Sequence, residues 1–290
     1  MATKPEEVRS EVMLRRIKKY CRVNGMPYNV INNVVDQILR EGALPFEYLR
    51  LYGGPDQSGR DSLTHRSLRT GDCPKNWREV FGYMRNAGVA RMWFGIKFGS
   101  NNPDYKLLDA GCGDGWSMEA YESRGIDCVG IDKSILAIEF SQHSSLHVTR
   151  PSRRAGYDYR MVYDRSVSKD ARRADILRLG QSGFRKNEFD GVNYTGAMMM
   201  LPWVEKATSG MKIDGEEACF QSLLELKRVH KPGGIMHLVT SNEKFAKSEP
   251  EYANPQERVL IKIIKDAGYT ILHKRAAGRE MGGYLLRNEK

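Results

Sequence analysis

The sequence has few cysteines and no long apolar run. The cysteines number five and include no C-x-x-C pair: Cys21, Cys73, Cys112, Cys128 and Cys219. An odd number without paired spacing argues against a disulfide framework or a zinc knuckle, and it favours a reducing compartment. The opening residues MATKPEEVRSEV lack the apolar core of a signal peptide, and no stretch is long enough to cross a membrane. We therefore expect a soluble cytoplasmic protein with no metal site and no membrane partner.

Basic residues outnumber acidic residues in this sequence. The 290 residues include 46 Lys and Arg against 36 Asp and Glu, a net charge of +10. The excess lies mainly in residues 1–100, with 17 basic and 10 acidic side chains, and in residues 141–173, with 8 and 3. Such a balance fits a nucleic-acid partner, an anionic substrate or a solvated surface. An apolar fraction of 40% excludes a disordered chain and can build a core for one large or two smaller domains.

The most informative stretch is Lys106 to Ser134, KLLDAGCGDGWSMEAYESRGIDCVGIDKS. Its order predicts a buried strand, a turn with glycine at 111, 113 and 115, a helix over 116–123, and a strand over 126–131 that ends at Asp132. Glycines at this density allow positive φ and close approach of a ligand to the backbone. Asp109 and Asp114 beside the turn would repel a pyrophosphate and would suit a positively charged ligand.

The run LLDAGCGDG, with an acid at the end of the next strand, resembles the first motif of class I S-adenosylmethionine-dependent methyltransferases. The resemblance covers about residues 104–288, and RVHKPGGIMHLV is similar to the fifth-strand element of that family. It implies a Rossmann-like, mostly parallel seven-stranded α/β sheet flanked by helices, with the last strand antiparallel. The cofactor it implies is S-adenosyl-L-methionine. A nucleotide-binding Rossmann unit of another kind is the alternative.

The resemblance also implies a role for particular residues. Asp109 and the backbone at Gly111, Gly113 and Gly115 would hold the methionine end of the cofactor, and Asp132 would accept the ribose hydroxyls. Asp175 and Ile176, in the run ADIL, would contact the adenine amine and ring. Asn193 would complete the cofactor site at the next strand end. Ordinary capping is the alternative explanation for Asp175.

The segment that faces the transferred methyl group in this family reads Asn193-Tyr194-Thr195-Gly196. It lacks the Asp/Asn-Pro-Pro-aromatic run of adenine- and cytosine-amine methyltransferases, and the chain has no Pro-Cys pair for cytosine-C5 chemistry. Tyr194 is the candidate for contact with the acceptor, although packing at the strand end explains it as well. Candidates for a general base are Tyr194, His143 and His147, with His230 and His237 as the other histidines suited to that chemistry.

Two segments lie outside the family pattern. Residues 1–100 predict a helical cap, with amphipathic helices over 10–23 and 28–40 and further helices over 45–52 and 76–86. The segment 141–173 is longer than an ordinary connection and predicts an insertion. In it, Arg150, Arg153, Arg154 and Arg160 are interleaved with Tyr157, Tyr159 and Tyr163 and could bind an anionic acceptor, while a solvated loop is the alternative. The expected domains are thus 1–100, serving the acceptor more than the cofactor, and 101–290, binding the cofactor.

Together these features predict methyl transfer to an oxygen or nitrogen of a small-molecule acceptor that has an anionic part. The basic balance keeps an RNA- or DNA-directed methyltransferase as an alternative. A non-catalytic cofactor-binding or scaffold protein is a second alternative, which the intact acids and glycines disfavour.

Overall fold

The computed structural model describes residues 5–44, 47, 102–122, 125–150, 158–198, 201, 205, 213–241, 256–277 and 281–289. Its helices are α1 (Pro5–Val23), α2 (Tyr28–Arg40), α7 (Trp116–Glu122), α8 (Ile135–Gln142), α10 (Gly215–Val229), α12 (Glu257–Asp266) and the 3₁₀ turn η2 (Leu179–Ser182). Its strands are β1 (Lys106–Ala110), β2 (Asp127–Asp132), β3 (Ser144–Arg150), β4 (Asp158–Tyr163), β5 (Ala171–Arg173), β6 (Phe189–Thr195), β7 (His230–Ser241), β8 (Tyr269–Ala277) and β9 (Met281–Asn288). No helix in the described part of the chain is long and apolar enough to span a membrane.

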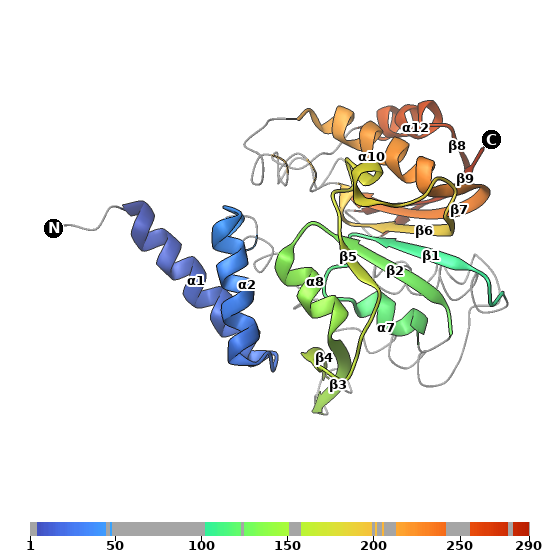
Figure 1. The fold of residues 1–290 in the computed structure, drawn as a ribbon. Helices are drawn as coiled ribbons and strands as arrows, with labels where there is room; N and C mark the ends of the chain where they lie inside the picture. Colours follow the sequence, from blue (N-terminus) through green and yellow to red (C-terminus); the bar gives the residue numbers. More distant parts are fainter. Residues whose placement is uncertain are drawn as a thin grey trace.

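A seven-stranded sheet in the order β5-β2-β1-β6-β7-β9-β8 forms the centre of the molecule (Figure 1). Pairing is parallel from β5 through β7, while β9 runs antiparallel to both β7 and β8. Helices α10 and α12 cover one face, and α7 and α8 cover the other. The strand order reverses at β1 and β6, so the carboxyl ends of these strands border a crevice. The predicted seven-stranded α/β sheet with an antiparallel last strand is confirmed.

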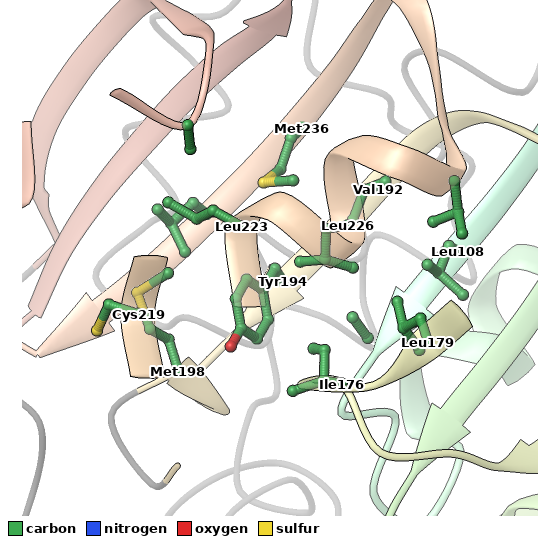
Figure 2. Packing of buried hydrophobic residues seen from close by; sticks show 14 of the residues in the cluster. Leu108, Ile176, Leu179, Val192, Tyr194, Met198, Cys219, Leu223, Leu226 and Met236 are labelled. Atoms are coloured by element: carbon green, nitrogen blue, oxygen red, sulfur yellow. The ribbon is translucent and has the colours of Figure 1, made fainter. Parts of the chain in front are cut away.

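The main core lies between the sheet and the layer of α10 and α12. Alternate residues of the central strands, including Leu108, Val192 and Tyr194, meet Leu223 and Leu226 of α10 (Figure 2). Side chains at the intervening positions point to the opposite face, since neighbouring residues in a strand alternate. This alternation sends Leu108 and Ala110 of β1 and Val192 and Tyr194 of β6 into this core, and it sends Asp109 and Asn193 to the other face.

The N-terminal helices pack on α8, the helix that follows Asp132. Ile31 and Ile38 of α2 join Leu136 and Phe140 of α8 in a second apolar cluster, to which β4 adds Tyr163. The predicted helix over 28–40 is confirmed, although Leu39 of its expected apolar face is 47% exposed. Residues 5–44 are therefore attached to the side of the α/β unit that carries the acid at the end of β2.

The segment 141–173 contains regular structure that its composition did not indicate. Strands β3 and β4 form an antiparallel hairpin, and β5 is an edge strand of the main sheet. The backbone N–H of Tyr163 donates to the carbonyl of Asn24, 2.8 Å away, so the hairpin is tied to the turn between α1 and α2. The insertion is thus a structural connection between the N-terminal helices and the sheet.

Several predicted boundaries are wrong. Helix α1 begins at Pro5 and not at Ser10, and β7 begins at His230, before the predicted start at Ile235. Helix α12 begins at Glu257 after Gln256 as N-cap, two residues beyond the expected cap at Asn254. The predicted helix over 76–86 lies outside the described residues, and so does the predicted helix over 45–52 apart from Glu47.

Candidate functional site

The glycine turn after β1 has the conformation that the sequence predicts. Gly111, Gly113 and Gly115 have φ of 75°, 61° and 82°, a left-handed region that L side chains rarely adopt. A Cβ at Gly111 would lie 2.6 Å from the Cβ of Ala197, in the turn that follows β6. A Cβ at Gly115 would lie 2.9 Å from the Cα of Ser141. Glycine is therefore required both by the backbone angles and by the close approach of these segments.

Asp132 joins the glycine turn to the start of α8. One of its carboxylate oxygens accepts from the backbone N–H of Gly113 at 3.1 Å, and the other accepts from that of Ser134 at 2.9 Å. The residue is 9% exposed, at the carboxyl end of β2. An ionised carboxylate only accepts hydrogen bonds, and the hydroxyls of a ribose can donate them. Asp132 thus has the position and the acceptor chemistry that a ribose needs.

Asp109, Asn193 and His237 form a buried polar row across three strands. They are direct neighbours in the registers of β1, β6 and β7. The amide nitrogen of Asn193 donates to Asp109 at 2.8 Å, and its amide oxygen lies 3.1 Å from Nδ1 of His237. A carboxylate only accepts, so the Asn193 amide nitrogen must face Asp109 and its oxygen must face His237. His237 consequently carries a proton on Nδ1.

Asp175 lies within a network of ion pairs after β5. One carboxylate oxygen is 2.9 Å from the ammonium of Lys133 and 2.8 Å from the guanidinium of Arg178. Glu205, 2% exposed, pairs with the same two cations at 3.1 and 2.6 Å. An adenine amine at Asp175 would share that carboxylate with two cations, so this role stays a proposal.

Ile176, the other residue predicted to contact the adenine, lies in the main core (Figure 2). It is 8% exposed. Packing of the core therefore accounts for most of its surface, and its contact with the adenine ring also stays a proposal.

Glu47 lies at the site although nothing in the sequence singles it out. It is fully buried, and its carboxylate accepts from the hydroxyl of Ser134 and from the backbone N–H of Ile135, both at 2.7 Å. Burial raises its pKa to about 7, against the lowering effect of these donors. Asp132 and Glu47 therefore lie on either side of Ser134. Only a contact between distant segments reveals such a residue, because a single acid between Phe46 and Tyr48 belongs to no motif in the sequence.

The predicted catalytic candidates have different surroundings. Nδ1 of His143, at the end of α8, lies 3.0 Å from the carbonyl of Val167 and is oriented by it. His147 pairs with Arg160 in the hairpin register. Tyr194 is fully buried beside Met198 and Cys219, and burial raises its pKa well above 10, so its phenol stays neutral (Figure 2). Its place in the core does not favour contact with an acceptor.

Of the predicted substrate-binding arginines, Arg150 lies in the described part of the chain. Arg150 ends β3 and pairs with Asp158 of β4. Arg153 and Arg154 lie outside the described residues. The hydroxyl of Ser144, the first residue of β3, donates to the carbonyl of Asp114 at 2.9 Å. The hairpin therefore starts in contact with the glycine turn.

These residues fit the cofactor that the resemblance implies. Gly111 and Gly115 leave no room for a side chain at their positions, and acids stand at the ends of β1 and β2. S-adenosylmethionine carries a sulfonium, an ammonium and a ribose, which acids and glycine backbone can hold. Asp109, Gly113 and Asp132 would be its main contacts, with Asp175 less well suited.

Residues 108–238 match a family described as "Methyltransferase domain". No curated protein matches the chain. Similar solved structures include a SAM-dependent methyltransferase from Methanosarcina mazei, at 18% identity and a TM-score of 0.46, covering 65% of this chain and 94% of that one. Another is the [4+2]-cyclase SpnF, at 14% identity and a TM-score of 0.49, covering 69% and 82%. A third is a complex of the Haloferax volcanii Trm112 methyltransferase activator with a putative methyltransferase, at 12% identity and a TM-score of 0.48, covering 74% and 95%.

Proposed function

We propose that this chain methylates an oxygen or nitrogen of a small-molecule acceptor with an anionic part. The chain belongs to the class I S-adenosylmethionine-dependent methyltransferases. The observation that carries the cofactor part is Asp132, held at the end of β2 by the glycine turn and by Ser134. The acceptor part rests on the basic hairpin and on the absence of the amine-directed Pro-Pro signature from the sequence.

When bound, the cofactor would supply an activated methyl group on its sulfonium, and the sulfonium becomes a neutral thioether once the acceptor's lone pair has taken that methyl group. The protein's main contribution is then alignment of the two reactants, which can remove a large part of the activation barrier of the transfer. Asp132 fixes the ribose, and Asp109 with the glycine turn fixes the methionine end. The row Asp109–Asn193–His237 keeps the Asp109 carboxylate in one orientation.

The anionic part of the acceptor is assigned to Arg150, Arg153 and Arg154. Support comes from the contact between Ser144 and Asp114, which starts the hairpin at the cofactor turn. Replacing the three arginines together with Ser should raise the KM of the acceptor by about 3- to 150-fold and leave cofactor affinity unchanged, at about 0.2–1 kcal/mol for each lost ion pair of the surface type. An acceptor KM equal to that of the wild type would contradict this assignment.

The matched control removes three positive charges from another surface. Arg15, Arg16 and Lys19 are exposed on α1, so their joint replacement with Ser changes the net charge equally. A small-molecule acceptor contacting the hairpin should be insensitive to the α1 triple variant. Equal effects of both triple variants would point to long-range attraction of a polyanion.

The second candidate is an RNA- or DNA-directed methyltransferase. The exposed Arg15, Arg16, Lys19 and Arg22 favour it, since they form a basic face on α1. Cell extract incubated with methyl-labelled cofactor decides between the two. Label in the metabolite fraction supports the first proposal, and label in nucleic acid, with binding that weakens steeply with salt, supports the second.

We also propose a cytoplasmic location. The four cysteines in the described ranges, Cys21, Cys112, Cys128 and Cys219, are buried and form no disulfide there. Buried thiols without disulfides are usual in a reducing compartment.

A further inference from the structure

Glu47 comes from the N-terminal part of the chain but contacts the loop that follows Asp132. Its two oxygens accept from the Ser134 hydroxyl and the Ile135 N–H at 2.7 Å, and a longer contact of 3.4 Å reaches the N–H of Leu136. The first N–H groups of a helix have no partners within the helix. Glu47 thus supplies acceptors to the start of α8, from 87 residues earlier in the chain.

Ser134 links this carboxylate to the cofactor site. Its hydroxyl donates to Glu47 and accepts from the N–H of Ala137, while its backbone N–H donates to Asp132. Asp132 in turn accepts from Gly113. A continuous chain of hydrogen bonds therefore runs from Glu47 through Ser134 and Asp132 to the glycine turn.

The site places two carboxylates close together in a buried setting. Glu47 is completely buried and Asp132 nearly so. Burial is the main reason that the pKa of Glu47 rises, and the charge of Asp132 adds to it. Such an arrangement persists only where directed donors offset its cost, as the Ser134 hydroxyl and two backbone N–H groups do here.

We propose that Glu47 is a positioning residue for the ribose of the cofactor. It fixes Ser134 and the start of α8, and thereby the carboxylate of Asp132 that accepts the ribose hydroxyls. The N-terminal region then contributes to cofactor affinity, whereas the sequence led us to expect a role mainly toward the acceptor. This inference rests on the proposed ribose role of Asp132.

Calorimetric titration of the full chain with S-adenosylmethionine, and separately with adenosine, tests the proposal. Glu47→Ala should weaken both ligands by about tenfold or more, the usual size of coupling between linked sites. Glu47→Gln keeps one acceptor oxygen and should lose less. Methionine alone should bind both variants as it binds the wild type, because it lacks the ribose.

Two further variants make the test specific. Tyr163→Phe removes the 2.6 Å bond to Glu139 in the same N-terminal interface without touching the loop after Asp132, so its affinities should match the wild type. In a cycle with Ser134→Ala, the losses of Glu47→Gln and Ser134→Ala should multiply to less than their full product, because both variants affect the bond between the Ser134 hydroxyl and Glu47.

The outcomes separate this inference from the proposed function. If Asp132→Asn loses affinity for adenosine while Glu47→Ala and Glu47→Gln bind as the wild type, the positioning role of Glu47 is wrong and the ribose site stands. Equal losses of ligand affinity in Tyr163→Phe and Glu47→Gln would also overturn the positioning role, because they would indicate a general loosening of the N-terminal interface. If Asp132→Asn binds adenosine normally, the ribose assignment fails and the inference fails with it.

Discussion

The carboxylate of Asp109 lies 2.8 Å from the side-chain amide of Asn193, although 84 residues separate them in the sequence. Both are fully buried, at paired positions of β1 and β6. A carboxylate in such a place needs a fixed donor, because an unsatisfied buried acceptor is costly. Asn193 is therefore placed to orient Asp109 from the neighbouring strand, consistent with its predicted position at the cofactor site.

Asn193→Asp should destabilise the protein by about 3 kcal/mol or more near neutral pH, since it sets two buried carboxylates against each other and removes a donor. The loss should shrink as the pH falls, because one of the pair then takes up a proton. Urea unfolding at pH 7 and pH 5 measures both effects. A loss that does not change with pH would contradict the direct contact.

Gly111→Ala should weaken both folding and cofactor binding. Its new methyl group meets Ala197, and its φ of 75° is strained for alanine. Gly183→Ala is the matched control, with a φ of 78° and open space around the added carbon. Both should lose about 1–2 kcal/mol from backbone strain. Only Gly111→Ala should lose more than this, together with cofactor affinity, in unfolding and titration experiments.

Tyr194→Phe should retain methyl transfer. The phenol is buried in the core, with an elevated pKa that keeps it neutral, and so it has no route to act as a base. Loss of one buried hydroxyl should cost about 1 kcal/mol of stability. Label transfer from methyl-labelled cofactor in extract provides the assay. A large drop in transfer by a folded variant would restore Tyr194 as a catalytic residue.

His230 should make stability depend on pH between about 4 and 6.5. Burial lowers its pKa from 6.5 to about 4, so the unfolded chain binds a proton in this range that the folded chain does not. Stability from the neutral ring is therefore complete above pH 6.5 and is lost as the pH falls, with a limit of about 3 kcal/mol below pH 4.

Other groups titrate in the opposite sense, so the prediction is best tested by difference. Burial raises the pKa values of Glu47 and Glu122 to about 7, which reduces stability as the pH rises from 4.5 to 7. His230→Asn leaves those groups unchanged. The free energy of unfolding of this variant should fall less than that of the wild type between pH 6.5 and 4. Equal slopes would show that His230 is not a buried neutral ring.

The sequence predicts the parts of this fold that depend on local pattern. The order of strand, glycine turn, helix and acid in residues 106–134 is what the structure shows, because each step has a local cause such as the positive φ of Gly113. The amphipathic spacing of Ile31, Val34 and Ile38 similarly predicts the buried face of α2. Boundaries move by a few residues where tertiary pairing extends a strand, as at His230.

Contacts between distant segments could not be predicted in this way. No periodicity indicates that Glu47 reaches Ser134, or that Tyr163 joins the cluster of the N-terminal helices. The basic composition of 141–173 suggested a loop, while the pairing that makes β3 and β4 a hairpin depends on cross-strand contacts. For Tyr194 the sequence left contact with the acceptor and packing at the strand end as alternatives, and strand alternation turns its side chain into the core.

The central claim is that Asp132 holds the ribose of S-adenosylmethionine, and calorimetric titration of Asp132→Ala tests it most directly. The control is Asp190→Asn, which removes a carboxylate paired with Lys231 near the start of β6, at the opposite end of the sheet. Asp132→Ala should weaken cofactor binding by about 1–3 kcal/mol, or about 5- to 150-fold, while Asp190→Asn should bind as the wild type. Unchanged affinity in a folded Asp132→Ala variant would contradict the account.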